Sequence, residues 1–80
     1  MTEFIYTIHA EKRMRERKIS KQLVEDIYYN PDRKYPAEGE SERAVRNFGG
    51  FEIIVTFEEL KRKHKTIKII STHKIKIHGG

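Results

Sequence analysis

The chain has 80 residues, of which 17 are Lys or Arg and 12 are Asp or Glu, and it contains no cysteine. This length predicts one small domain over residues 1–80, and the lack of cysteine excludes disulfides, thiolate zinc sites and thiol nucleophiles. No apolar run reaches the roughly 20 residues that span a bilayer, and the amino-terminal segment does not resemble a secretory signal. We therefore expect a cytoplasmic protein without a membrane partner.

The first part of the chain predicts a short strand followed by two helices. A β-prone run predicts an edge strand within residues 1–6. Thr7 and Ser20 each precede a helix-forming segment, and their hydroxyl oxygens can accept the free backbone N–H groups at its start. The second helix should stop at Asn30, because the residue before a proline avoids helical backbone angles. With only a short turn between the helices, residues 7–30 are expected to form an antiparallel helical hairpin.

Residues 33–77 follow a different period, in which apolar and polar side chains alternate as they do in strands. The alternation is clearest over residues 51–57, where the odd positions are apolar. Gly49–Gly50 before it supplies the positive φ that a tight hairpin needs. The sheet and the helices each have one apolar face, so each must cover the other. We expect an α+β domain of the order (β)ααβββ, with the helical hairpin packed on an antiparallel sheet of three or four strands.

Positive charge is concentrated at the carboxyl end. Residues 1–60 hold 10 basic and 12 acidic side chains, whereas residues 61–80 hold 7 basic side chains and no acidic one. Clustered cations raise the affinity for nucleic acids, because they displace condensed counterions from the phosphates. The same composition is also found in solvated basic tails. The charge therefore predicts an RNA or DNA partner without establishing one.

One local pattern in the first predicted helix suggests chemistry. His9, Arg13 and Arg17 recur at i, i+4 and i+8, so they lie along one line of the helix surface. The helix dipole favours a neutral imidazole at His9, which could remove the proton of an RNA 2′-hydroxyl while the two guanidinium groups stabilise the phosphorane. Such a reaction needs no metal or cofactor, because the nucleophile belongs to the substrate. The spacing is equally that of an ordinary surface helix.

The predicted strands supply further candidates for phosphate contact. Lys68, Thr72 and Lys74 share the outer sheet face, opposite the buried isoleucines of the last strand, where they could bind a nucleic-acid backbone. Arg46 lies in the middle of an earlier strand and either contacts phosphate or pairs with Glu52 across the hairpin. The same pattern is also that of a normal solvated sheet face.

The remaining histidines and the last apolar residues carry weaker predictions. The four histidines lack the spacing of metal ligands, so no metal site is predicted. His73 falls in phase with the inward isoleucines of its strand. Ile75 and Ile77 continue the alternation and can pair within the monomer or with a second copy. We expect a monomer or a weak homodimer.

Two segments resemble a known family. T-I-H-A-E-K-R-M-R-E-R-K-I-S and V-E-D-I-Y-Y-N-P-D-R are similar to the H-A-x-x-R-M-x-x-R-x-I-S and N-P-D motifs of domain of unknown function 4258, and the match spans roughly residues 7–73. That family is similar in fold to RelE-type toxins. The resemblance implies a RelE-like βααβββ fold, metal-independent RNA cleavage and an antitoxin partner, and it points to His9, Arg13, Arg17 and Thr72.

RelE-type catalytic residues usually lie on the sheet face away from the helices, whereas His9 and the two arginines of this chain lie on a predicted helix. One cleft can hold both sets only if the first helix overhangs an edge of the sheet. The leading hypothesis is a toxin-like endoribonuclease, acting on mRNA that is free or ribosome-bound and controlled by a small acidic antitoxin. The alternatives are a non-catalytic nucleic-acid-binding module and a protein-interaction module.

Overall fold

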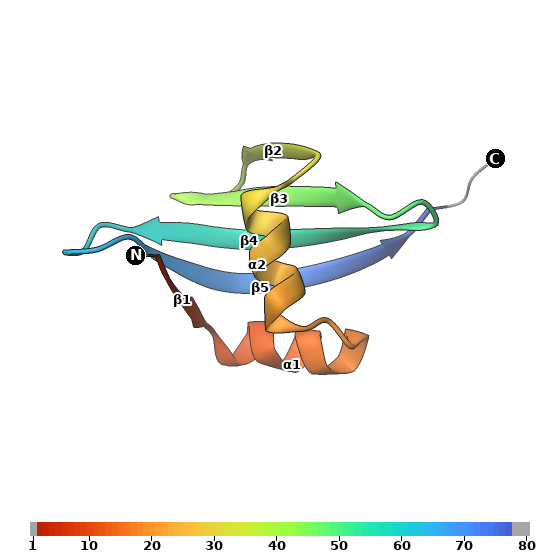
Figure 1. Ribbon diagram of the computed structural model, residues 1–80, viewed down its shortest axis with the longest axis horizontal. Coiled ribbons are helices and arrows are strands. Elements are labelled where there is room, and N and C mark those ends of the chain that lie inside the picture. Colours follow the sequence, from red (N-terminus) through yellow and green to blue (C-terminus); the bar gives the residue numbers. More distant parts are fainter. Residues whose placement is uncertain (1, 78–80) are drawn as a thin grey trace.

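The protein folds into a single open sheet with two helices, as the computed structural model of residues 2–77 shows (Figure 1). The elements in chain order are β1 (Glu3–Tyr6), α1 (Ile8–Arg17), α2 (Lys21–Tyr29), β2 (Arg33–Pro36), β3 (Ser41–Asn47), β4 (Phe51–Leu60) and β5 (Thr66–Lys76). This arrangement confirms the α+β class.

The sheet is mixed rather than purely antiparallel. Its strand order is β1-β5-β4-β3-β2, and β2 to β5 pair antiparallel with their neighbours. Strand β1 pairs parallel with β5, so that the first strand of the chain lies beside the last. The prediction of three or four antiparallel strands was therefore wrong in strand number and in direction, although β1 does lie at an edge. Alternation of side chains does not reveal which strands pair or in which direction.

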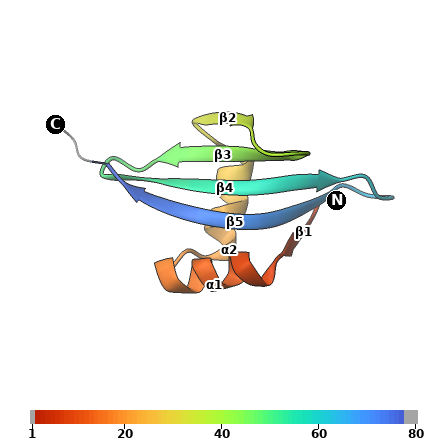
Figure 2. The same ribbon diagram turned by 180° about the vertical axis from the view of Figure 1, so that it is seen from behind.

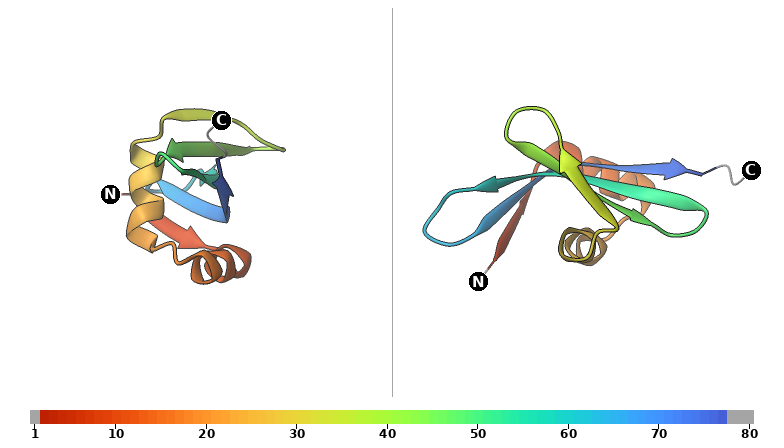
Figure 3. Two further views of the ribbon diagram at one scale, coloured as in Figure 1. Left: turned by 90° about the vertical axis from the view of Figure 1, so that its right-hand side faces the viewer. Right: turned by 90° about the horizontal axis from the view of Figure 1, so that it is seen from above.

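The helices do not form the predicted antiparallel hairpin. Helix α2 crosses one face of the sheet, whereas α1 runs along the sheet edge beside β5 (Figures 1 and 3). Thr7 fixes this position, because its backbone N–H donates to the Ile69 carbonyl at 3.1 Å and its hydroxyl donates to the Ile70 carbonyl at 2.8 Å. The Thr7 hydroxyl oxygen also accepts from the Ala10 N–H at 3.0 Å. Both predicted caps are confirmed, since the Ser20 hydroxyl accepts from Leu23 at 3.1 Å.

The hydrophobic core lies between α2 and the sheet. Helix α1 contributes only Ala10 and Met14, and α2 contributes Val24 and Ile27. The buried sheet residues of this cluster are Ala44, Ile53, Val55, Phe57, Ile67 and Ile69. No helix among residues 2–77 crosses the opposite face of the sheet (Figure 2). The sheet therefore has one covered face and one uncovered face.

A β-bulge divides β5 into two halves. Thr56 of β4 lies opposite Ser71, but the next residue, Phe57, lies opposite Ile69, so Ile70 has no counterpart. An extra residue in one strand shifts the alternation of its side chains by one position. Side chains that follow the bulge in β5 consequently point to the faces opposite to those that strict alternation predicts.

Candidate functional site

The bulge places two lysines on the covered side of the sheet. Lys74 lies opposite Ile53 and Lys76 lies opposite Phe51, and Ile53 belongs to the hydrophobic core. Both lysines are exposed, because β5 extends beyond the part of the sheet that α2 covers (Figure 1). The covered face of the sheet thus continues as an open, basic surface at one end of the molecule.

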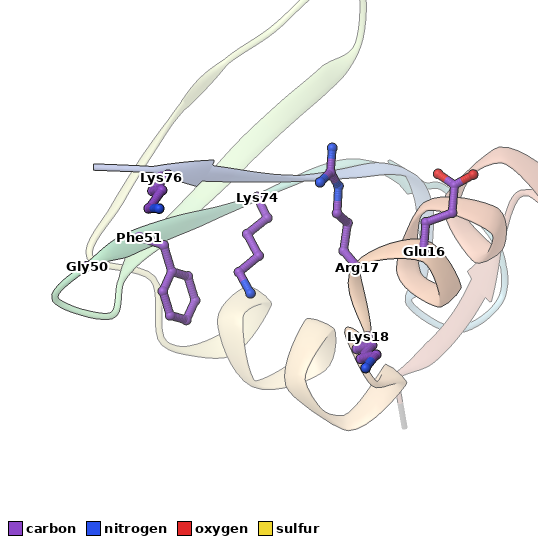
Figure 4. A pocket seen from close by; sticks show the side chains of 7 residues that line it. All are labelled: Glu16, Arg17, Lys18, Gly50, Phe51, Lys74 and Lys76. Carbon is purple, nitrogen blue, oxygen red and sulfur yellow. The ribbon is translucent and has the colours of Figure 1, made fainter. Parts of the chain in front are cut away.

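This surface forms one wall of a groove of about 490 Å³, and the carboxyl end of α1 forms the other (Figure 4). We call it the basic groove; its lining residues are Glu16, Arg17, Lys18, Gly50, Phe51, Lys74 and Lys76. Four of these side chains are cations and one is a carboxylate. The groove therefore carries an excess of positive charge, in contrast to residues 1–60 as a whole.

Arg17 reaches the groove because of its phase on α1. Ala10, Met14 and Arg17 recur at i, i+4 and i+7, so they lie on the same side of the helix. Ala10 and Met14 are buried against the core, whereas Arg17 lies past its end and is exposed in the groove. Lys18 then ends the helix with a left-handed φ of 55°, and its N–H donates to the Arg15 carbonyl at 3.3 Å.

Two stacked aromatic rings lie beside the groove, and each has a cation over its face. The Lys74 ammonium lies 4.4 Å from the centre of the Phe51 ring, and Phe51 stacks on Phe48 with 5.2 Å between ring centres. The Arg46 guanidinium lies 5.6 Å from the centre of the Phe48 ring. Gly49, with its φ of 93°, closes the hairpin that brings the two phenylalanines together. Flat apolar rings next to cations suit a ligand that has both bases and phosphates.

Of the three residues predicted to act together on α1, Arg17 alone lines the basic groove. Arg13 pairs with Glu16 at 3.7 Å, and both side chains are about half exposed. His9 is exposed at the amino end of the helix. Arg17 lies eight positions after His9 in the helix, which corresponds to about 12 Å along the helix axis. The structure therefore does not bring the predicted triad together around one cavity.

An ion pair with Glu52 was one of the two roles predicted for Arg46, and the structure does not form it. Its guanidinium forms an ion pair with Asp26 of α2, which lies over the same side of the sheet. Glu52 instead accepts two hydrogen bonds from Arg33, each of 3.0 Å. Arg46 thus links the sheet to α2, and its remaining surface contacts Phe48.

The predicted outer row of Lys68, Thr72 and Lys74 is broken by the bulge. Lys68 lies on the uncovered face, opposite Glu58, whereas Lys74 lies on the covered side. Thr72 is fully buried, and its hydroxyl has no hydrogen-bond partner within residues 2–77. The predictions that Thr72 faces outward and His73 inward were wrong, because both depended on uninterrupted alternation.

The uncovered face of the sheet carries charges of both signs. Lys68 is placed opposite Glu58, and Arg33 neutralises Glu52. His73 is exposed on this face, opposite Ile54. Because Glu52 and Glu58 lie among the cations of this face, which are Arg33, Arg43 and Lys68, it attracts a polyanion less strongly than the basic groove does.

Within residues 2–77, no group of three or more His, Asp or Glu side chains is placed to hold a metal ion. Neither helix there has the length and apolar character that crossing a bilayer requires.

Of the residues that line the groove, Arg17 and Lys74 were candidates from the sequence, whereas Glu16, Lys18, Gly50, Phe51 and Lys76 were not. Phe51 fits the buried phase of its strand, and its partly buried ring does pack against the core. Lys18 was assigned only to a turn. Lys74 and Lys76 alternate with Ile75 and Ile77 as the residues of an ordinary outer sheet face do, and only the bulge turns them to the covered side, so no signal in the sequence indicated that Lys76 lines the groove.

Comparisons with protein-family models, with curated proteins and with solved structures gave no match. The resemblance to domain of unknown function 4258 therefore stays a prediction. The functional proposal depends on the geometry and charge of the basic groove.

Proposed function

We propose that the protein binds single-stranded RNA in the basic groove. The groove has four cations and one carboxylate, and this excess of positive charge favours a polyanion. The neighbouring phenylalanines offer faces on which bases can stack. The cavity of about 490 Å³ lies within the range of roughly 300–1,000 Å³ that holds a drug-sized ligand, which is the size of one or two nucleotides. This juxtaposition of cations and rings is the observation that carries the proposal.

The position of the cations suggests a division of roles. Arg17 and Lys18 on one wall and Lys76 on the other would hold phosphates that flank the bound nucleotide. Lys74 covers the Phe51 ring in the free protein, and its flexible side chain can move to a phosphate when a base takes its place on the ring. A small acidic protein such as an antitoxin would compete for the same cations, but it would gain less from the aromatic faces.

Binding is tested by fluorescence anisotropy with a labelled RNA hexanucleotide. Base stacking on an aromatic side chain contributes about 1–3 kcal/mol, so Phe51→Leu should weaken binding by about 5-fold to 150-fold. Lys12→Ala, at an exposed position of α1 outside the groove, is the control and should bind as the wild type does. Circular dichroism checks that both variants fold. If Phe51→Leu folds and keeps wild-type affinity, the groove is not the RNA site.

RNA cleavage through the substrate 2′-hydroxyl is the second function that we propose, because Glu16 lines the groove together with Arg17 and Lys74. A carboxylate in this position can remove the 2′-hydroxyl proton as that oxygen bonds to phosphorus, and the cations can stabilise the phosphorane. The bond between phosphorus and the 5′-oxygen then breaks, the 5′-oxygen takes a proton from solvent water, and a 2′,3′-cyclic phosphate remains. His9 and Arg13 lie outside the groove, so their predicted part in cleavage stays a prediction.

Cleavage is tested by incubating the protein with mixed RNA in EDTA and identifying 2′,3′-cyclic phosphate ends. Loss of a general base typically lowers the rate by about 100-fold to 10,000-fold, and we expect Glu16→Gln to have this effect while His9→Ala does not. If instead His9→Ala lowers the rate and Glu16→Gln does not, the reaction takes place beside His9 on α1, outside the groove. Absence of products with the wild-type protein would leave a binding protein without nuclease activity.

A further inference from the structure

We infer that the β4–β5 turn is a second RNA-contacting surface, which acts with the basic groove on strands long enough to reach both. This inference rests on the proposed function and extends it to the length of RNA that the protein holds. We call residues 61–65, with the sequence Lys-Arg-Lys-His-Lys, the basic turn. The basic turn and the groove lie at opposite ends of the sheet (Figure 1), and the molecule extends 46 Å along its longest axis.

The cations of the basic turn are available to a ligand. All five side chains are exposed, and within residues 2–77 only His64 has a carboxylate partner, Glu3 at 3.0 Å. Consecutive like charges repel one another, which opposes folding unless an anion binds between them. Tight turns are usually built from Gly, Asn, Asp, Pro or Ser, none of which occurs here. Formation of the hairpin therefore does not account for this composition.

An exposed aromatic side chain lies beside the basic turn, as in the groove. The Lys65 ammonium lies 5.7 Å from the centre of the Tyr28 ring, and the Tyr28 ring lies 5.1 Å from that of Tyr29. Tyr29 is 56% exposed although it is large and partly apolar. The interaction with the Tyr28 hydroxyl raises the pKa of Lys65 above its ordinary value, so this lysine stays charged. Both ends of the sheet thus combine exposed cations with an accessible ring.

The distance between the two surfaces sets the RNA length that can reach both. A stacked strand advances about 3.4 Å per nucleotide, so about 13 nucleotides cover the 46 Å of the longest axis. A hexanucleotide covers about 20 Å at the same advance and can occupy only one of the two surfaces. A 20-nucleotide RNA is long enough for both.

The test compares these two RNAs with three proteins by anisotropy over a range of salt concentrations. The turn variant carries Lys61→Ala, Arg62→Ala and Lys63→Ala, and the matched control carries Lys12→Ala, Arg15→Ala and Lys34→Ala, which removes three exposed cations elsewhere. Because a longer RNA offers more binding registers, the comparison is made between proteins on the same RNA. Each lost phosphate contact reduces the slope of log affinity against log salt by about 0.7.

We expect the turn variant to bind the hexanucleotide as the wild type does and to lose about 2 from the salt slope with the 20-nucleotide RNA. The control should match the wild type with both RNAs. If the turn variant keeps the wild-type slope and affinity with the longer RNA, the inference is overturned while groove binding stands. If the wild-type protein binds neither RNA, the proposed function fails together with the inference.

Discussion

The salt dependence of hexanucleotide binding follows from the number of cations in the basic groove. Arg17, Lys18, Lys74 and Lys76 give four phosphate contacts when all are used. At about −0.7 per contact, log affinity should fall against log salt with a slope of about −2.8 in the wild type and about −1.4 in the double variant Lys74→Ala/Lys76→Ala. Both lysines are exposed, so their removal should not unfold the protein.

These slopes predict that raising the salt from 50 to 200 mM weakens wild-type binding by about 50-fold and binding by the double variant by about 7-fold. Anisotropy titrations at four salt concentrations measure both values. Lys12→Ala/Lys34→Ala removes the same net charge outside the groove and should keep the wild-type slope. Equal slopes for the two double variants would refute the reasoning, because net charge rather than the groove would then determine binding.

Three further predictions concern the groove and the core. Lys18→Gly should raise the free energy of unfolding by about 1 kcal/mol, because glycine adopts the left-handed φ of 55° without strain. The same change should weaken hexanucleotide binding, because it removes a cation from the groove. A variant less stable than the wild type would contradict the argument about backbone strain. Thr72→Val should stabilise the fold by about 1 kcal/mol in urea unfolding, because it removes a buried hydroxyl that has no partner among residues 2–77; destabilisation would reveal a partner. The pKa of Tyr6 is raised, first by burial and then by the hydrogen bond to Glu25, so wild-type stability should decline above pH 10 as the unfolded state loses this proton. The urea midpoint of Tyr6→Phe should decline less between pH 9 and 11, and equal declines would show that Tyr6 does not cause the effect.

The features that could be predicted from the sequence are local ones. The caps at Thr7 and Ser20 depend on a hydroxyl and the N–H groups within three residues of it. The Gly49–Gly50 hairpin depends on one positive φ, and the buried phase of β4 depends on alternation within one strand. Each of these properties is determined by neighbouring residues, so a single sequence contains the signal.

The features that failed depend on contacts between distant segments. The parallel pairing of β1 with β5 gives no periodic signal, and it determines that α1 lies along the sheet edge rather than against α2. The bulge at Ile70 shifts the second half of β5 by one position, which buries Thr72 and turns Lys74 toward the groove. Arg17 and Lys74 were both candidates from the sequence, but only this combination of edge and bulge brings them to one cavity.

The pairing of the first strand with the last also affects when the protein can fold during its synthesis. Glu3 lies opposite Thr66 and Tyr6 lies opposite Ile69, and Thr7 holds the start of α1 to the same stretch of β5. Chains emerge from the ribosome amino end first, so α1 has no edge to lie against until β5 has been made. The wall that carries Arg17 therefore takes its place only after β5 has formed, and we expect the basic groove to be incomplete in any shorter nascent chain.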